Sequence, residues 1–134
     1  MPDPVTPSHG LLLCATSYPA EAFMLRAVLE PAGWTVAVVD DAVTAMRELC
    51  RDPDQFVAVV IGERVGRTSG LSLSGLLRDS GCRLPIVLLT TDDSRIVAER
   101  AARLCLTVLW EPVSQERLVR TFRSLMPRRL CVAS

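Results

Sequence analysis

The sequence predicts a doubly wound α/β domain in which helices cover both faces of a five-stranded parallel sheet. Short apolar runs alternate along the chain with segments whose apolar residues recur every three or four positions, a spacing typical of amphipathic helices. The apolar runs are too continuous for half-exposed strands, so they indicate buried parallel strands. Because parallel neighbours are joined by helical crossovers, this alternation favours a single doubly wound sheet.

The strands are predicted from runs rich in leucine and β-branched residues. In chain order the runs are GLLLCA at 10–15, WTVAVV at 34–39, FVAVVI at 56–61, PIVLLT at 85–90 and LTVLW at 106–110. Five such strands in a small domain usually adopt the flavodoxin-like order 2-1-3-4-5. We expect that order here.

The helices are predicted between these runs and after the last one. They cover residues 20–33, 41–51, 71–81, 94–104 and 114–126. Asp40 or Asp41 and Ser114 have side chains suited to N-caps. Gly33 and Gly81 suit the residue at which a helix ends. The predicted architecture therefore has five strands and five helices.

Length and composition agree with one domain. The chain has 134 residues, of which 49% are hydrophobic, and this is enough for one buried core. We place the domain at residues 10–126, between a flexible N-terminal tail at 1–9 and a short C-terminal tail at 127–134. No apolar run is long enough to cross a membrane, and the N-terminus lacks a signal-peptide pattern. We therefore expect a cytoplasmic protein without a membrane partner.

The charged residues exclude several functions. Fifteen basic residues, all of them arginine, balance fifteen acidic residues, so no overall positive field would attract nucleic acid. Without lysine the chain cannot use a phosphate-loop lysine, a Schiff base or a lysine general base. The only histidine, His9, falls in the predicted tail, which leaves no histidine for a catalytic triad.

The spacing of several landmarks resembles the receiver domain of bacterial two-component response regulators. The landmarks are Ala32-Gly33-Trp34, Gly62 and the later Gly70, Thr90 at the end of LPIVLLT, and Trp110-Glu111-Pro112-Val113. In receivers these positions hold an Ala-Gly-Tyr element, the phosphoacceptor and a loop glycine, a hydroxyl residue, and a Lys-Pro-Phe element. The resemblance covers about residues 10–126 and implies the CheY-like form of the flavodoxin fold.

The resemblance also implies that the receiver active site is degenerate. Receivers hold magnesium with an acidic pair where this chain has Thr16 and Ser17, and their phosphoacceptor aspartate stands at the position of Gly62. Their phosphate-pairing lysine is replaced by Glu111, and only the hydroxyl residue is retained, as Thr90. We therefore expect no bound magnesium, no phosphorylation and no enzymatic activity.

A neighbouring acid does not restore the site in this interpretation. Glu63 directly follows Gly62, and adjacent residues of a strand point to opposite faces. We therefore expect Glu63 to be a poor substitute for the aspartate. Whether the Glu111-Pro112 peptide bond is cis, as its receiver counterpart often is, stays open at this point.

Four cysteines are predicted to share one end of the domain. Cys50 closes the second helix, Cys82 and Cys105 precede the last two strands, and Cys131 follows the fifth helix. These positions lie at the pole opposite the carboxyl ends of the strands. Four cysteines there predict a [4Fe-4S] cluster, with zinc less favoured. The alternatives are a redox disulfide between two of the thiols and ordinary structural cysteines.

Two helices carry candidate partner-binding residues. Arg117 and Arg120 lie on one stripe of the fifth helix, and Phe23 and Ala27 occupy first-helix positions that are usually polar in receivers. Receivers dock on histidine kinases mainly through the first helix, so an apolar patch there suits a kinase complex. The alternatives are a solvated arginine face and extra packing of the first helix.

The resemblance and the altered site together predict a phosphorylation-independent signalling protein. We expect it to bind and inhibit a sensor histidine kinase by occupying the place of a true receiver, gated by a cysteine-bound cluster or by thiol redox state. In this it resembles FixT-type single-domain inhibitors. The alternative is a scaffold or dimerisation module that acts on a transcription factor or another regulator. The identity of the kinase and the oligomeric state, a homodimer included, stay open.

Overall fold

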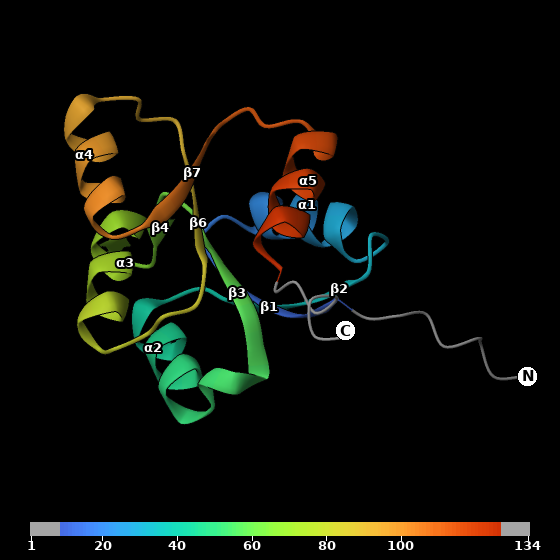
Figure 1. Ribbon diagram of the computed structural model, residues 1–134, viewed down its shortest axis with the longest axis horizontal. Helices are drawn as coiled ribbons and strands as arrows, with labels where there is room; N and C mark the ends of the chain where they lie inside the picture. Colours follow the sequence, from blue (N-terminus) through green and yellow to red (C-terminus); the bar gives the residue numbers. More distant parts are fainter. Residues whose placement is uncertain (1–8, 127–134) are drawn as a thin grey trace, which may run out of the picture.

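One parallel sheet forms the centre of the computed structural model, which describes residues 9–126. Its five strands are β1 (Gly10–Ala15), β2 (Trp34–Val39), β3 (Phe56–Ile61), β6 (Ile86–Thr90) and β7 (Leu106–Trp110). They lie in the order β2-β1-β3-β6-β7, so the predicted order 2-1-3-4-5 is confirmed (Figure 1). Every pairing between them is parallel, as helical crossovers require.

Five α-helices cover the sheet, four of them between strands and the fifth after the last strand. They are α1 (Pro19–Leu29), α2 (Ala42–Arg51), α3 (Gly70–Asp79), α4 (Arg95–Arg103) and α5 (Gln115–Leu125). Figure 1 shows α1 and α5 on one side of the sheet and α2, α3 and α4 on the other. Within residues 9–126, no helix has the length and apolar character needed to cross a membrane. The predicted tails, apart from His9, lie outside the described residues.

Two apolar clusters lie on opposite faces of the sheet. Leu12 and Cys14 of β1 pack in the cluster that includes residues of α1 and α5. Leu13 and Ala15 pack in the cluster that includes residues of α2 and α3. Successive strand residues point to opposite faces, so both faces of β1 are buried. This explains why its sequence is continuously apolar.

Four of the predicted helices agree with the observed ones to within two residues at each end, but α1 ends at Leu29, four residues before the predicted end at 33. Asp41 at the start of α2 and Ser114 at the start of α5 each accept a backbone N–H from the first turn. Such caps satisfy donors that have no partner inside the helix. Gly33 and Gly81 follow α1 and α3 with φ angles of +114° and +92°, a region that glycine adopts without strain.

His9 contacts the folded domain, although the prediction places it in the N-terminal tail. The His9 backbone N–H donates to the Gly33 carbonyl oxygen across 2.8 Å. Its ring centroid lies 4.7 Å from that of Trp34. The prediction that His9 belongs to a flexible tail is therefore wrong, because Trp34 offers an apolar surface on which the imidazole packs.

A short hairpin after β3 has no counterpart in the sequence prediction. Its strands are β4 (Arg64–Val65) and β5 (Thr68–Ser69), which pair antiparallel. Two-residue strands are too short to produce a recognisable alternation. A 3-10 helix, η1 (Pro53–Gln55), leads into β3.

The edge strand β7 is less buried than predicted. Its first three residues are half-buried, and Trp110 at its end is 43% exposed. The prediction of full burial also fails at β2, where Thr35 is exposed and the last three residues are half-buried. The reason is the same for both strands, because β2 and β7 each have a neighbouring strand on one side only.

Candidate functional site

The carboxyl ends of the strands bring four predicted site residues to one edge of the sheet. Thr16 follows β1, Gly62 follows β3, Thr90 ends β6 and Glu111 follows β7. Backbone hydrogen bonds join these strand ends: the Gly62 N–H donates to the Ala15 carbonyl and the Glu111 N–H to the Thr90 carbonyl, each across 2.9 Å. The parallel sheet thus assembles most of the predicted site, as sheets of this topology do.

Ser17, the fifth predicted residue, is engaged elsewhere. Its hydroxyl oxygen accepts the backbone N–H of Gly66, and its own N–H donates to the Arg64 carbonyl across 2.8 Å. Ser17 therefore fastens the loop after β1 to the β4–β5 hairpin. This contact could not be predicted without the hairpin.

The space beside Gly62 is filled by a side chain that the sequence analysis did not single out. Gly62 is buried, and a Cβ atom there would collide with Glu21 Oε1 and would lie 2.8 Å from Thr16 Oγ1. The Thr16 hydroxyl donates to Glu21 Oε1 across 2.7 Å and so holds the carboxyl group in place. Glu21 belongs to the first turn of α1, a position that the receiver resemblance does not mark as part of the site.

The surroundings of Glu21 favour its protonated form. Burial is the largest cause and raises its pKa, whereas the hydrogen bond from Thr16 lowers it. A hydrogen bond with Glu111 and the negative charges of Glu111 and Glu63 raise the pKa further. The resulting pKa is about 7, against an ordinary value of 4.5. Three carboxyl groups therefore converge near Gly62, and one of them carries a proton in a large share of molecules at neutral pH.

Glu63 reaches the site, contrary to expectation. Its Oε2 accepts the Thr90 hydroxyl across 2.7 Å and the Thr91 backbone N–H across 2.8 Å. These hydrogen bonds lower the pKa of Glu63, with that from Thr90 first in importance. The expectation that Glu63 points away is wrong because β3 ends at Ile61, so strand alternation does not extend to Glu63.

Two local geometries complete this edge. The Glu111-Pro112 peptide bond is cis, which answers the question that the sequence leaves open. A Cβ atom at Gly70 would collide with the Gly62 carbonyl oxygen. Glycine at position 70 is therefore required by the close approach of α3 to the loop after β3.

The predicted four-cysteine group is not assembled by its three described members. Cys50 and Cys82 line one hollow of about 180 Å³, and Cys82 and Cys105 line a second of about 300 Å³. Within residues 9–126, no three side chains of His, Cys, Asp or Glu are arranged to hold a metal ion. Cys50 lies at the end of α2 and Cys105 just before the edge strand β7, and Cys131 lies outside the described residues.

A groove of about 680 Å³ lies between α1 and α5, which are side by side (Figure 1). Its lining residues are Ala27, Val28 and Pro31 on the α1 side and Gln115, Glu116, Val119, Arg120 and Arg123 on α5. Of the predicted partner-binding residues, Ala27 and Arg120 line this groove. Phe23 lies outside the lining but is 75% exposed on α1.

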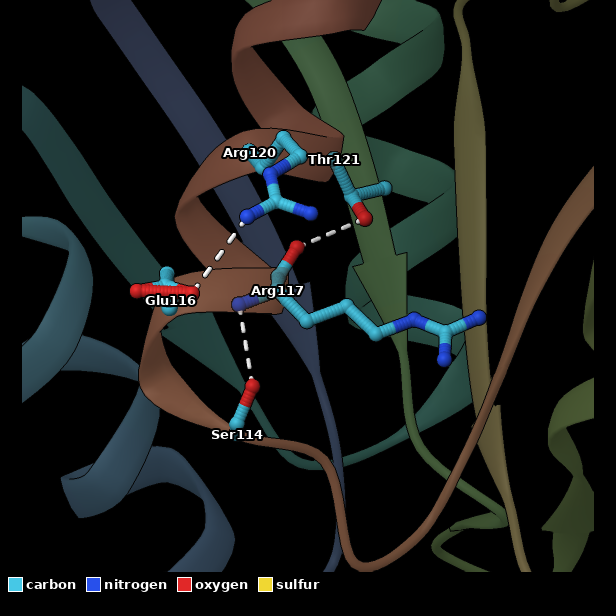
Figure 2. Close-up of polar contacts among 5 residues, drawn as sticks. All are labelled: Ser114, Glu116, Arg117, Arg120 and Thr121. Atoms are coloured by element: carbon cyan, nitrogen blue, oxygen red, sulfur yellow. Dashed lines mark hydrogen bonds and ion pairs between the residues drawn. The ribbon is translucent and has the colours of Figure 1, made fainter.

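Figure 2 shows the polar contacts of α5. An ion pair joins Arg120 Nη2 to Glu116 Oε1 across 3.3 Å, and the Thr121 hydroxyl donates to the Arg117 carbonyl oxygen across 2.8 Å. The Arg117 guanidinium extends away from this pair and has no hydrogen bond or ion pair within the described residues (Figure 2). The two predicted arginines are therefore both exposed, and only Arg120 faces the groove.

Comparison with curated proteins gives sequence relatives among response regulators. The chain is 36% identical to the response regulator MprA of Mycobacterium leprae over 108 residues, which cover 78% of this chain and 45% of that protein. It is 35% identical to MprA of Mycobacterium avium, with the same coverage. The chain thus spans less than half the length of these relatives. No protein-family model matches it.

Comparison with solved structures gives the same fold. A response regulator receiver domain from Clostridium thermocellum has a TM-score of 0.80 at 14% identity, covering 92% of this chain and 98% of that one. Vibrio cholerae CheY4 has a TM-score of 0.76 at 19% identity, covering 87% and 98%. The receiver domain of Francisella response regulator 1452 has a TM-score of 0.78 at 21% identity, covering 87% and 96%. The chain therefore has the fold of response-regulator receiver domains and is similar in sequence to response regulators.

Proposed function

We propose that this receiver domain accepts no phosphoryl group and acts by binding and inhibiting a sensor histidine kinase. The observation that carries the proposal is at Gly62, where receivers have their aspartate. Gly62 offers no nucleophile, and the Glu21 carboxyl group fills the space that an aspartate side chain would need. The phosphoryl transfer therefore lacks an acceptor.

The charges near Gly62 also oppose the transfer. Glu21 has Glu63 and Glu111 as charged neighbours, where receivers offer a magnesium ion and a lysine. The chain contains no lysine. Phosphoryl transfer depends on cations that neutralise the charge of the phosphoryl oxygens, and carboxylates repel those oxygens.

Thr90 is already engaged with an acid of its own chain. Its hydroxyl and the Thr91 N–H both donate to Glu63 Oε2. The donors that this edge would offer to an external anion are therefore occupied. The Asp92 N–H in turn donates to Thr90 Oγ1 across 3.0 Å, so the loop between β6 and α4 is held in place without phosphorylation.

The surface proposed for the kinase combines α1 with the groove between α1 and α5. Ala27 and Val119 make part of the groove apolar, and Arg120 supplies positive charge. Phe23 lies one helical turn before Ala27 and is 75% exposed, so it can anchor a helix of the partner. The receiver resemblance supports this surface, because receivers dock on histidine kinases mainly through their first helix. A domain bound there without a phosphoacceptor would block phosphotransfer by occlusion.

Phosphotransfer assays test both halves of the proposal. Purified sensor histidine kinases from the genome that encodes this chain are labelled with radioactive ATP, with and without the protein. We expect one kinase to pass less label to its own response regulator while no label reaches this chain. Label on this chain that hydroxylamine removes would contradict phosphorylation independence, and unchanged transfer by every kinase would contradict inhibition.

A pair of matched variants tests the docking surface. Phe23 is exposed on α1, and Val43 is 67% exposed on α2, on the other side of the sheet. We expect Phe23→Asp to weaken kinase binding about tenfold or more, the typical effect of losing an aromatic anchor. Val43→Asp should bind like the wild type. Equal effects of the two substitutions would contradict docking through α1.

A second candidate function is a self-associating scaffold, which exposed apolar side chains on α4 and β7 favour. Ile96 of α4 is 70% exposed and Trp110 of β7 is 43% exposed, and α4 packs against β7. Apolar groups gathered on neighbouring elements suit an interface between two copies. Sedimentation equilibrium tests it: a dimer that Ile96→Glu dissociates and Phe23→Asp leaves intact would favour the scaffold.

A further inference from the structure

Cys82 and Cys105 line one hollow at the pole of the sheet opposite Gly62. The hollow has a volume of about 300 Å³, and its other lining residues are Arg78, Arg83, Arg103 and Leu104. Cys82 is partly exposed and Cys105 is exposed, and both are free thiols. Two reachable thiols thus share a hollow with three guanidinium groups.

Arg78 ties the two cysteine segments together. Its Nη1 donates to the carbonyl oxygens of Cys82 and Leu84 across 3.0 and 2.7 Å. Its Nε donates to the Leu104 carbonyl across 2.7 Å, and its Nη2 donates to the Cys105 carbonyl across 3.2 Å. One planar guanidinium group therefore spans the segments that lead into the paired strands β6 and β7.

Cys105 has a backbone conformation that favours glycine. Its φ angle is +57°, and within residues 9–126 no other residue besides glycine has a positive φ. It directly follows Leu104, the C-cap of α4, where helices commonly end in glycine or asparagine. Burial does not explain a cysteine here, because the residue is exposed. A strained residue without a packing role indicates a functional one.

We propose that Cys82 and Cys105 form a dithiol redox site that a small anionic disulfide oxidises. Arg83 and Arg103 have no hydrogen bond or ion pair within the described residues, and both line the hollow. Their guanidinium groups are therefore available to carboxylates of the incoming molecule, such as those of oxidised glutathione. Cys50 is not part of this hollow.

The reaction consists of two thiol–disulfide exchanges. The Cys105 thiolate attacks one sulfur of the disulfide RSSR, whose S–S bond breaks, and the leaving RS⁻ takes up the proton that Cys105 released. The Cys82 thiolate then attacks the Cys105 sulfur of this mixed disulfide. The second RS⁻ leaves and takes up the proton from Cys82. Two protein thiols are thereby oxidised to a disulfide, and one RSSR is reduced to two RSH.

Peptide mapping of the full chain after treatment with oxidised glutathione tests the pair. We expect a Cys82–Cys105 linked peptide as the main product. In Cys82→Ser the reaction should stop at a glutathione adduct on Cys105. Cys50→Ser is the matched control, because Cys50 is also exposed but lies outside the hollow, and it should give the same linked peptide as the wild type.

Charge variants test the selection of an anionic disulfide. We expect Arg83→Gln combined with Arg103→Gln to slow oxidation by glutathione disulfide about fivefold, because the field that attracts the carboxylates is lost. Oxidation by neutral hydroxyethyl disulfide should keep its rate. Arg117→Gln combined with Arg123→Gln removes the same charge from α5 and should change neither rate.

Three results would overturn the dithiol site. The first is a main product that links Cys82 or Cys105 to Cys50 or Cys131. The second is a glutathione adduct on Cys105 that persists in the wild type without a linked peptide. The third is iron and sulfide bound to protein purified without oxygen and lost in Cys82→Ser, which would indicate a cluster instead.

Discussion

The Glu21 carboxyl group occupies the space beside Gly62 that an aspartate side chain would need. The Thr16 hydroxyl anchors this group, and Glu111 contributes a second carboxyl group next to it. The absence of an aspartate at position 62 and the position of the Glu21 carboxyl group are therefore structurally linked. An aspartate at position 62 and the present position of Glu21 exclude each other.

Gly62→Asp is expected to destabilise the domain without creating a phosphoacceptor. Its Cβ atom would collide with Glu21 Oε1 and press against Thr16 Oγ1. Overpacking of this kind costs about 1 to 3 kcal/mol, and urea unfolding measures the loss. Adding Glu21→Ala to the same chain should recover most of that stability. Strictly additive effects of the two substitutions would contradict the contact.

Glu21 should make the stability of the domain depend on pH. Burial, together with Glu111 and Glu63, raises the pKa of Glu21 to about 7 in the folded chain, from an ordinary value of 4.5. Between these values the folded state binds more protons than the unfolded state, so its stability falls as pH rises. The contribution of protonated Glu21 is complete below about pH 4.5 and lost above about pH 7.

The substitution Glu21→Gln tests this dependence because glutamine does not ionise. As pH rises through this window, the unfolding free energy of the wild type should fall relative to that of Glu21→Gln. Urea unfolding at several pH values measures it. Two curves that stay parallel from about pH 4.5 to 7.5 would show that Glu21 does not titrate in this range.

Much of the fold could be predicted because the central strands β1, β3 and β6 are largely buried on both faces and therefore read as continuous apolar runs. The caps Asp41 and Ser114 mark the starts of α2 and α5. The hairpin of β4 and β5 could not be predicted, since two residues per strand leave no pattern. The place of His9 could not be predicted either, because its packing on Trp34 is a tertiary contact.

The site was predictable where it follows the sheet. Gly62, Thr90 and Glu111 could be identified because the receiver resemblance assigns those positions, and they lie together because the carboxyl ends of parallel strands meet at one edge. Glu21 reaches the same place from α1, and no strand pattern leads to it. Glu63 lies beyond the end of β3, where the alternation used to exclude it no longer applies.

Arg78→Lys is expected to destabilise the domain by about 2 to 3 kcal/mol. Arg78 donates hydrogen bonds to four backbone carbonyl groups on two segments. A lysine ammonium is a single point charge and cannot reproduce the planar fork, so partly buried carbonyl groups lose their donors. Arg83→Lys is the matched control in the same hollow, and it should change stability by less than about 0.5 kcal/mol. If Arg78→Lys and Arg83→Lys destabilised the domain equally in urea unfolding, this would contradict the role of Arg78 in holding the two segments together.

Thr90→Val is expected to loosen the attachment of Glu63. The Thr90 hydroxyl is buried, donates to Glu63 Oε2 and accepts the Asp92 N–H. Valine has nearly the same shape without these groups, so the substitution should cost about 1 to 2 kcal/mol. The hydrogen bond from Thr90 is the largest cause of the lowered pKa of Glu63. That pKa should therefore rise towards its ordinary value in Thr90→Val.

Titration of the Glu63 carboxyl group by NMR measures this rise, and Thr90→Ser keeps the hydroxyl as a control. The serine variant should retain the low pKa of Glu63, because the same donor remains. If Thr90→Val left the titration of Glu63 unchanged, the backbone N–H and hydroxyl of Thr91 would be sufficient to hold the carboxylate. The Thr90 hydroxyl would then be available to an external anion. Its hydrogen bond to Glu63 could no longer support the proposal that the domain acts without phosphorylation.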